Sequence, residues 1–347
     1  MKIKNREAVK PLGSHTAVGH LNEFGKWKEI AYLKDNNGML PPFMIAVGSR
    51  ARVLKVVEAL ELRKPRFIDR ESSKKMGEHC FGRTSVLVGV AEQDDFQFPL
   101  AVFETQMGCP ATQIVAREIM YFSRDNGYET EGGYVKSDGL YIVRAGTCAG
   151  VNSHDKAEHR IGIGDILLAG ESYGSVGALV QSVLGEINFT GVSIGKRVDK
   201  TRKFLEEHRN LRLSHDRMNL STRSSCRLLL HLQKAAAQLG LDSLTGANFT
   251  KDSLYAEMGE EGFAMLRDRY GVVSTEMEQL ALDVLAAEFT AAGIPAHSGL
   301  VSAAIGAIPG KSFPETPEEK KAASDAEENA LKVAAAALGS VAKSMNS

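Results

Sequence analysis

The sequence predicts an α/β fold in which helices enclose a sheet. Short apolar runs bounded by Gly and Pro alternate along the chain with stretches whose apolar residues recur at helical spacing. Hydrophobic residues make up 43% of the 347 residues, which is enough apolar material for a large core and excludes a disordered chain. We expect one main domain at residues 41–345, preceded by an irregular arm at residues 1–40.

The charge balance excludes several classes of function. Lys and Arg number 42 against 43 Asp and Glu, so the chain lacks the basic excess of a duplex-DNA-binding protein. No apolar run approaches the ~20 residues that span a bilayer, and the first residues lack the apolar core of a secretion signal. We therefore expect a cytoplasmic protein with neither nucleic acid nor a membrane as its partner.

The cysteines indicate neither a zinc site nor a disulfide framework, because they lie far apart and form no Cys-x-x-Cys pair. They are Cys80, Cys109, Cys148 and Cys226. We expect four reduced thiols.

The first regular elements follow the arm directly. Residues 43–47 (FMIAV) form a short apolar run between a Pro pair and Gly48, which predicts a buried strand. Apolar side chains then recur at helical spacing over residues 51–62. The domain thus begins as a strand, a glycine turn and a helix.

The same criteria predict the later elements. Further strands are expected at residues 85–90, 99–105, 140–145 and 166–168, the first two joined by a hairpin turn at residues 92–95. Further helices are expected at residues 112–122, 225–239, 275–289 and 317–342. The last helix follows Thr316-Pro317-Glu318-Glu319, a sequence typical of a capped helix start.

Residues 171–223 are the least regular stretch and predict a solvated insertion. Five glycines precede a charged run at residues 196–217, in which we expect a helix around residues 200–208. Acidic residues dilute the basic ones, and no aromatic residues are interleaved with them, so a nucleic-acid-binding patch is not expected.

Three segments carry candidate chemistry, and the first is residues 48–52 (GSRAR). It follows a strand and opens a helix, so its backbone N–H groups and the guanidinium of Arg52 suit an anion. It lacks the Gly-Lys-Ser/Thr ending of a phosphate-binding Walker loop and the GxGxxG of a dinucleotide site, which argues against a dehydrogenase. Taken alone, the segment is better explained as a surface Arg cluster at a turn.

The second segment is residues 143–150 (VRAGTCAG), where Arg144 stands near the end of an apolar strand. A charged side chain there is costly without a partner. The partner is either a bound anion or a core carboxylate, and we favour the anion because Thr147 lies at the strand end, where α/β proteins commonly bind ligands.

The third segment is residues 274–279 (STEMEQ), at the start of an expected helix. Glu276 and Glu278 are two residues apart and cannot share a helix face. Glu276 fits a solvated helix cap, whereas Glu278 lies at the edge of the apolar stripe and is harder to explain structurally.

In this order, the three segments resemble the nucleoside phosphorylase-I family, and uridine phosphorylases most closely. Residues 48–52 keep the Gly and the last Arg of the family's Gly-Asp-Pro-x-Arg, and residues 144–149 match Arg-x-Gly-Thr-x-Gly except for Ala149. Residues 164–166 match its Gly-Asp-Val/Ile, and residues 276–278 its Glu-Met-Glu. The resemblance implies a three-layer α/β/α sandwich with a central mixed, partly barrel-like sheet.

The resemblance also implies roles for individual residues in phosphorolysis of a nucleoside. The phosphate-binding residues would be Gly48, Arg52, Arg83 from a neighbouring subunit, Arg144 and Thr147. The nucleoside-binding residues would be His20, Thr147, Leu254, Met258, Glu276, Met277 and Glu278. Of these, Met277 would lie against the ribose, Glu278 would bind its hydroxyls, and His20 would reach across a dimer. We take Arg52, Arg144 and Glu278 as the catalytic residues.

The base is harder to predict. Purine-specific members place an Asp where this chain has Ala303, which favours uridine. Uridine phosphorylases read uracil with Gln-x-Arg, but Met258 and Glu260 stand at those positions, and Leu254 replaces the stacking Phe. A purine nucleoside phosphorylase, a nucleosidase of the same superfamily and a nucleoside-binding relative without catalysis are therefore the alternatives.

The resemblance finally implies the small molecules and partners. Inorganic phosphate would be the co-substrate, and no organic cofactor is expected. The assembly would be a homodimer or a higher homo-oligomer, with a potassium or calcium ion at the dimer interface.

Overall fold

The computed structural model describes residues 5–11, 16, 36–68, 84–153, 160–174, 211–213, 220–251, 260–311 and 313–347. Its helices are η1 (Arg6–Val9), α3 (Arg50–Ala59), α5 (Cys109–Tyr121), α8 (Cys226–Gln238), α9 (Glu260–Tyr270), α10 (Gln279–Ala291) and α11 (Pro317–Asn346). Its first strands are β1 (Phe43–Val47), β2 (Arg63–Ile68), β3 (Val86–Gln93), β4 (Phe96–Glu104), β5 (Gly127–Thr130) and β6 (Gly133–Lys136). The later strands are β7 (Leu140–Val151), β8 (Ile166–Gly174), β9 (Leu211–Leu213), β10 (Leu220–Arg223), β11 (Ser243–Thr250), β12 (Val272–Glu276) and β13 (Ala296–Ile308).

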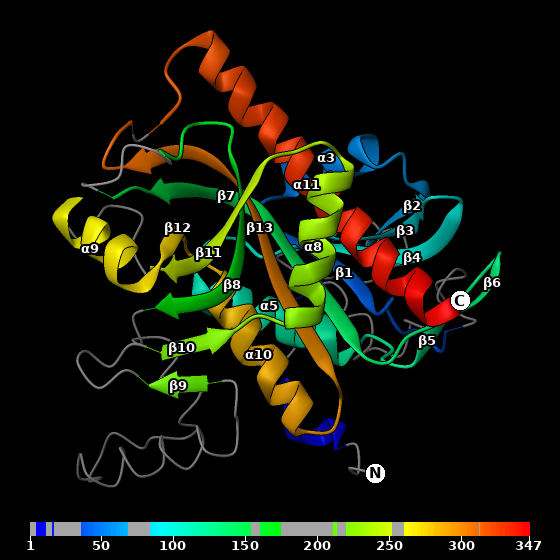
Figure 1. The fold of residues 1–347 in the computed structure, drawn as a ribbon. Coiled ribbons are helices and arrows are strands. Elements are labelled where there is room, and N and C mark those ends of the chain that lie inside the picture. Colours follow the sequence, from blue (N-terminus) through cyan, green and yellow to red (C-terminus); the bar gives the residue numbers. More distant parts are fainter. Residues whose placement is uncertain are drawn as a thin grey trace, which may run out of the picture.

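The central sheet is mixed and partly closed, as expected. In the described residues its strands follow the order β2-β3-β4-β1-β7-β12-β11-β8-β10-β9. Strand β13 pairs parallel with β7 and antiparallel with β8, so β7, β12, β11, β8 and β13 form a closed ring (Figure 1). Closure of this kind leaves those five strands without a free edge.

Helices cover both faces of the sheet. This arrangement explains why every residue of β1 is apolar. Phe43, Ile45 and Val47 belong to the core under α3, α8 and α11, whereas Met44 and Ala46 belong to the core under α5 and α10. Alternate side chains of a strand point to opposite faces, so a strand buried on both faces reads as a continuous apolar run. The three-layer α/β/α expectation is confirmed.

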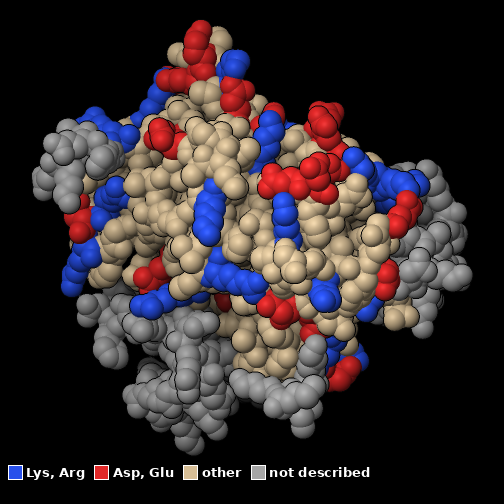
Figure 2. All heavy atoms as spheres, turned by 45° about the vertical axis from the view of Figure 1, so that its right-hand side comes forward, with Lys and Arg blue, Asp and Glu red and all other residues tan. Residues whose placement is uncertain are grey.

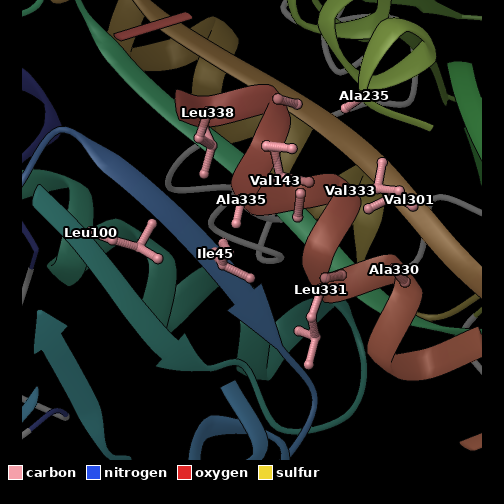
Figure 3. Packing of buried hydrophobic residues seen from close by; sticks show 14 of the residues in the cluster. Ile45, Leu100, Val143, Ala235, Val301, Ala330, Leu331, Val333, Ala335 and Leu338 are labelled. Atoms are coloured by element: carbon pink, nitrogen blue, oxygen red, sulfur yellow. The ribbon is translucent and has the colours of Figure 1, made fainter. Parts of the chain in front are cut away.

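Helix α11 runs along one face of the sheet. Figure 3 shows its Ala330, Leu331, Val333, Ala335 and Leu338 among core residues of the strands. The side chain of Thr316 accepts from Glu319 N at 3.2 Å, and the Glu319 carboxylate accepts in return from Thr316 N at 3.1 Å. This reciprocal cap confirms the predicted helix start, and such a cap contributes about 1 kcal/mol.

Several predicted elements need correction. The helix expected at residues 275–289 is strand β12 followed by α10, because the VVST run pairs with β11 before the helix starts. Strand β7 extends to Val151, past residue 145, because its second half pairs with β12 and β13. Strands β2, β11, β12 and β13 were not predicted. The small residues of β11 and β13 hide their strand character: a Cβ on Gly299 would lie 3.1 Å from Leu228 and Leu232 on α8.

The proposed domain limits remain predictions. Within residues 171–223, the described parts are the end of β8 and the short antiparallel strands β9 and β10. The helix expected around residues 200–208 lies outside the described residues, as does most of the arm.

Figure 2 shows acidic and basic side chains interspersed over the face that it presents, in keeping with the near-zero net charge. In the described parts of the chain, no helix combines the length and the apolar character needed to cross a membrane.

Candidate functional site

A cleft with a volume of about 690 Å³ opens over the middle of β7. Strand β1 pairs with the first half of β7, with Ala46 opposite Arg144, and β12 pairs antiparallel with its second half, with Thr275 opposite Ala149. The ends of β1 and β12 therefore meet from opposite directions beside Thr147. Strand ends at such a switch in direction commonly form ligand sites in α/β proteins.

The cleft is polar at one end and apolar at the other. Its lining residues are Gly48, Ser49, Arg52, Glu104, Gln106, Met107, Arg144, Thr147, Cys148, Ala149, Lys251, Thr275, Glu276, Met277, Glu278, Ile305, Ile308 and Phe313. All seven of the sequence-predicted site residues that fall in described segments are among them. The cleft brings together Gly48, Arg52, Arg144, Thr147, Glu276, Met277 and Glu278.

Arg144 is buried, with 3% of its surface exposed, and forms an ion pair with Glu278. Its Nη2 donates to Glu278 Oε2 at 2.6 Å. Of the two partners considered for Arg144, the structure thus contains the core carboxylate. Its Nε is buried and has no hydrogen-bond partner among the described residues.

Arg52 extends from the first turn of α3 toward β7. Ser49 caps this helix, its side chain accepting from Arg52 N at 3.4 Å. The guanidinium Nη2 donates to Thr147 Oγ1 at 3.1 Å and to Glu327 Oε1 at 2.9 Å. A Cβ on Gly48 would lie 3.0 Å from Arg52 Nη1 and 3.6 Å from Arg144 Nη2, so the glycine lets both guanidinium groups approach the backbone.

Glu276 is buried at the end of β12 and acts as a helix cap, but it is not solvated. Its Oε2 accepts from the backbone N–H groups of Glu278 at 2.7 Å and Gln279 at 2.8 Å. Its Oε1 accepts from Asn248 Nδ2 at 2.8 Å and Thr250 Oγ1 at 2.6 Å. Burial, and next the nearby Glu278 carboxylate, raise the pKa of Glu276. With four protein donors already bound, this carboxylate mainly fixes the start of α10.

Glu278 is held through both carboxylate oxygens. Besides the bond from Arg144, its Oε1 accepts from Gly108 N at 3.0 Å. Gly108 has a φ of +87°, which favours glycine at this turn. Burial opposes ionisation, but Arg144 and the backbone hydrogen bonds outweigh it, so the pKa of Glu278 lies below its usual value.

Farther along β7 from Arg144 the cleft is mainly apolar, with Ile305 and Ile308 of β13 and Phe313 after it in the wall, whereas Met107 directly precedes Gly108. Lys251 is the basic residue at this end; it follows β11, and its backbone N–H donates to Glu276 O at 2.8 Å. Its Nζ lies 5.9 Å from the ring centroid of Phe263. Local sequence signals do not mark these residues, because most of them lie on or after β11 and β13, whose small residues hide their strand character.

Ala303 is fully buried in β13 and does not line the cleft. His20, Arg83, Leu254 and Met258 lie outside the described residues, so their roles remain predictions. Within the described parts, no group of three or more His, Cys, Asp or Glu side chains could hold a metal ion. The predicted interface cation likewise remains a prediction.

Solved structures resemble this chain over most of its length. One is the purine nucleoside phosphorylase from Toxoplasma gondii in complex with immucillin-H, with a TM-score of 0.56, 18% identity, and coverage of 90% of this chain and 94% of that one. The chain has the nucleoside phosphorylase fold. Two structures of uridine phosphorylase from Vibrio fischeri, one complexed with 6-hydroxy-1-naphthoic acid, share this fold with TM-scores of 0.53 and 0.54. Each is 14% identical to this chain; coverage is 88% and 86% of this chain and 92% of theirs.

No protein-family model and no curated protein matches the sequence. The nucleoside phosphorylase fold therefore rests on structure, and at 14–18% identity it does not by itself assign a substrate. The function has to be argued from the cleft.

Proposed function

We propose that the protein is a nucleoside phosphorylase, which converts a nucleoside and inorganic phosphate into a free base and ribose 1-phosphate. One observation carries this proposal: Gly48, Arg52, Arg144 and Thr147 meet at one end of a single cleft, directly beside the Glu278 carboxylate. Two guanidinium groups and a hydroxyl suit a phosphate, and a carboxylate suits the hydroxyls of a ribose.

At the phosphate end, the guanidinium groups of Arg52 and Arg144 lie where they can donate hydrogen bonds to a bound anion. Arg52 Nη1 and Arg144 Nη2 both lie close to the backbone at Gly48, at the end of β1. A phosphate bound there would accept from both guanidinium groups and from Thr147. Fixing the phosphate next to the sugar converts an encounter of two substrates into a reaction between positioned groups.

Glu278 supports the sugar during the reaction. Each of its oxygens accepts one protein hydrogen bond and can accept another from a ribose hydroxyl. When the bond between C1′ and the base nitrogen breaks, its electron pair leaves with the base and positive charge develops on the sugar. A phosphate oxygen then forms the new bond to C1′. An ionised Glu278 favours the positively charged sugar, and no covalent enzyme intermediate is needed.

We infer that the base is a pyrimidine, with uridine as the substrate. The β13 residues in the cleft are Ile305 and Ile308, and Ala303 occupies the position expected for a purine-protonating Asp. These side chains supply no acid for a purine. Lys251 at the same end offers a cation to the negative charge that uracil carries as it leaves.

The assembly proposed with this function is a homodimer, with His20 and Arg83 reaching the neighbouring site. The exposed apolar side chains Met107 and Phe313, 75% and 55% exposed in the isolated chain, lie at the cleft and would suit coverage by a second copy. An activity assay at limiting concentration, combined with size-exclusion chromatography, tests this. A fully active monomer would contradict it.

The deciding experiment measures base release from uridine, inosine and adenosine, each with and without phosphate. Phosphate-dependent release of uracil is expected. Release of a purine base instead would overturn the pyrimidine assignment, and release without phosphate would make the protein a nucleosidase. No release from any of the three would favour a nucleoside-binding protein.

A further inference from the structure

A phosphate-binding arginine is effective only when its long side chain is held in place. Arg52 has many rotamers, and its guanidinium is about a quarter exposed, so burial alone does not fix it. Two hydrogen bonds hold it instead: Nη2 donates to Thr147 on β7 and to Glu327 on α11. The second contact joins the phosphate end of the cleft to the last helix.

The packing of α11 places Glu327 at this position. Residues 327, 331, 334 and 338 follow one another at intervals of three or four and so lie on one side of the helix. Leu331, Ala334 and Leu338 on this stripe are buried in the core, and Figure 3 shows Leu331 and Leu338 projecting from α11. Glu327 continues the stripe by one turn, to where α11 meets α3.

Glu327 is also close to a second cation of α3. Lys55 Nζ lies 3.7 Å from Glu327 Oε2 and donates to Ser324 O at 3.0 Å. The carboxylate therefore lies between Arg52 and Lys55, with one oxygen toward each. A carboxylate between two cations restrains both side chains and limits their mutual repulsion.

We propose that Glu327 is a positioning residue for phosphate binding, holding the Arg52 guanidinium at the phosphate end of the cleft before the anion arrives. This inference rests on the proposed phosphorylase function. The opposing effect is repulsion between the Glu327 carboxylate and the phosphate. Glu327 is itself about a quarter exposed, so solvent screens this repulsion, whereas removing the carboxylate leaves Arg52 held by Thr147 alone.

The chain offers a matched control one residue further along. Glu328 pairs with Lys332 at 2.7 Å on the same helix, with 42% of its side chain exposed, and it is not among the cleft residues. The variants to compare are Glu327→Ala, Glu327→Gln and Glu328→Ala. Both alanine variants remove one carboxylate from α11, so they share any general effect on the helix.

Two readouts are measured: steady-state kinetics with phosphate and nucleoside varied separately, and the rise in Tm produced by inorganic phosphate. Glu327→Ala is expected to raise the KM for phosphate about tenfold, with the nucleoside KM changed less than about twofold. Glu327→Gln should show a smaller rise, because the amide oxygen still accepts from Arg52. Glu328→Ala should behave as the wild type.

An unchanged or lowered phosphate KM in Glu327→Ala would overturn the proposal, as would equal effects in Glu327→Ala and Glu328→Ala. If the wild type releases no base with phosphate, the phosphorylase function fails on its own. In that case the Tm measurement still decides the role of Glu327. If phosphate raises the Tm of the wild type and of Glu328→Ala but not that of Glu327→Ala, the positioning role of Glu327 is supported. If phosphate does not raise the Tm of the wild type, that role is overturned.

Discussion

The two ends of the cleft are built in different ways. The phosphate end consists of charged residues tied by ion pairs, Arg144 to Glu278 and Arg52 to Glu327, and by hydrogen bonds to β7 and the turn at Gly108. The base end consists of apolar side chains from β13 and the segment after it, with Lys251 beside them. Under the proposed function, short charged motifs bind the anion, whereas the base is bound by residues that distant strands bring together.

Arg144→Ala should give the largest loss and so tests whether the charged end dominates catalysis. We expect kcat/KM to fall by about 10³ or more, because the variant loses a phosphate donor and leaves Glu278 buried without its cation. Removing one partner of a buried pair costs about 3–5 kcal/mol of stability, so folding has to be checked by circular dichroism and Tm. Arg144→Lys keeps the charge and serves as the folded comparison. Near-normal activity in Arg144→Ala would show that Arg144 is not part of the site.

Glu278→Gln separates the sugar contact from the phosphate contact at the same end. We expect kcat/KM to fall about 10²-fold, with the nucleoside KM rising more than the phosphate KM. Because the pKa of Glu278 lies below its usual value, its carboxylate stays ionised at neutral pH, and the wild-type activity it supports should be lost only as the pH falls below about 4.5. A pH–rate profile in a range where the protein stays folded checks this. An acid limb near pH 6 that Glu278→Gln abolishes would contradict it.

Lys251→Met tests whether the base end contributes more than apolar contact. We expect about a tenfold loss of kcat with uridine, and a smaller loss with 5-fluorouridine, whose base is a better leaving group. Lys234→Met, an exposed lysine on α8, is the control. Equal losses with both nucleosides would mean that Lys251 does not stabilise the departing base.

Asp283→Asn should give the smallest effect and concerns the support behind the charged end. Asp283 is buried on α10, where its Oδ1 accepts from Gln279 at 2.7 Å and Ser298 at 2.5 Å. Burial raises the pKa of Asp283 to about 7 from 3.8. Between these values the folded state keeps a proton that the unfolded chain has released, so stability falls as the pH rises from about 4 to about 7.

The asparagine variant removes this titration. Its Tm at pH 8 should therefore exceed that of the wild type by about 2 °C, and the difference should disappear near pH 4. Thermal unfolding across this pH range, with the exposed Asp325→Asn on α11 as the control, measures it. A wild-type Tm that does not fall between pH 5 and pH 8 relative to Asp283→Asn would contradict the prediction.

The sequence predicted the charged end better than the base end for physical reasons. Gly48, Arg52, Arg144 and Thr147 stand in two short segments at a strand end and a helix start, where local signals are strong. The Glu327 contact could not be predicted, because Glu327 is 275 positions away from Arg52 and looks like any charged residue of an exposed helix face. Ile305 and Lys251 depend on β13 and β11, whose small residues conceal two strands until the ring closes.

Because α11 is at the end of the described chain, its contacts with the sheet and with Arg52 form late in synthesis. Of the described elements, α11 emerges last from the ribosome, after the whole sheet. A nascent chain that stops before residue 317 has this face of the sheet covered only by α3 and α8, and Arg52 lacks its carboxylate. Docking of the final helix therefore completes the core and brings Glu327 to Arg52 in a single event, so under the proposed function the anion site is complete only once α11 has docked.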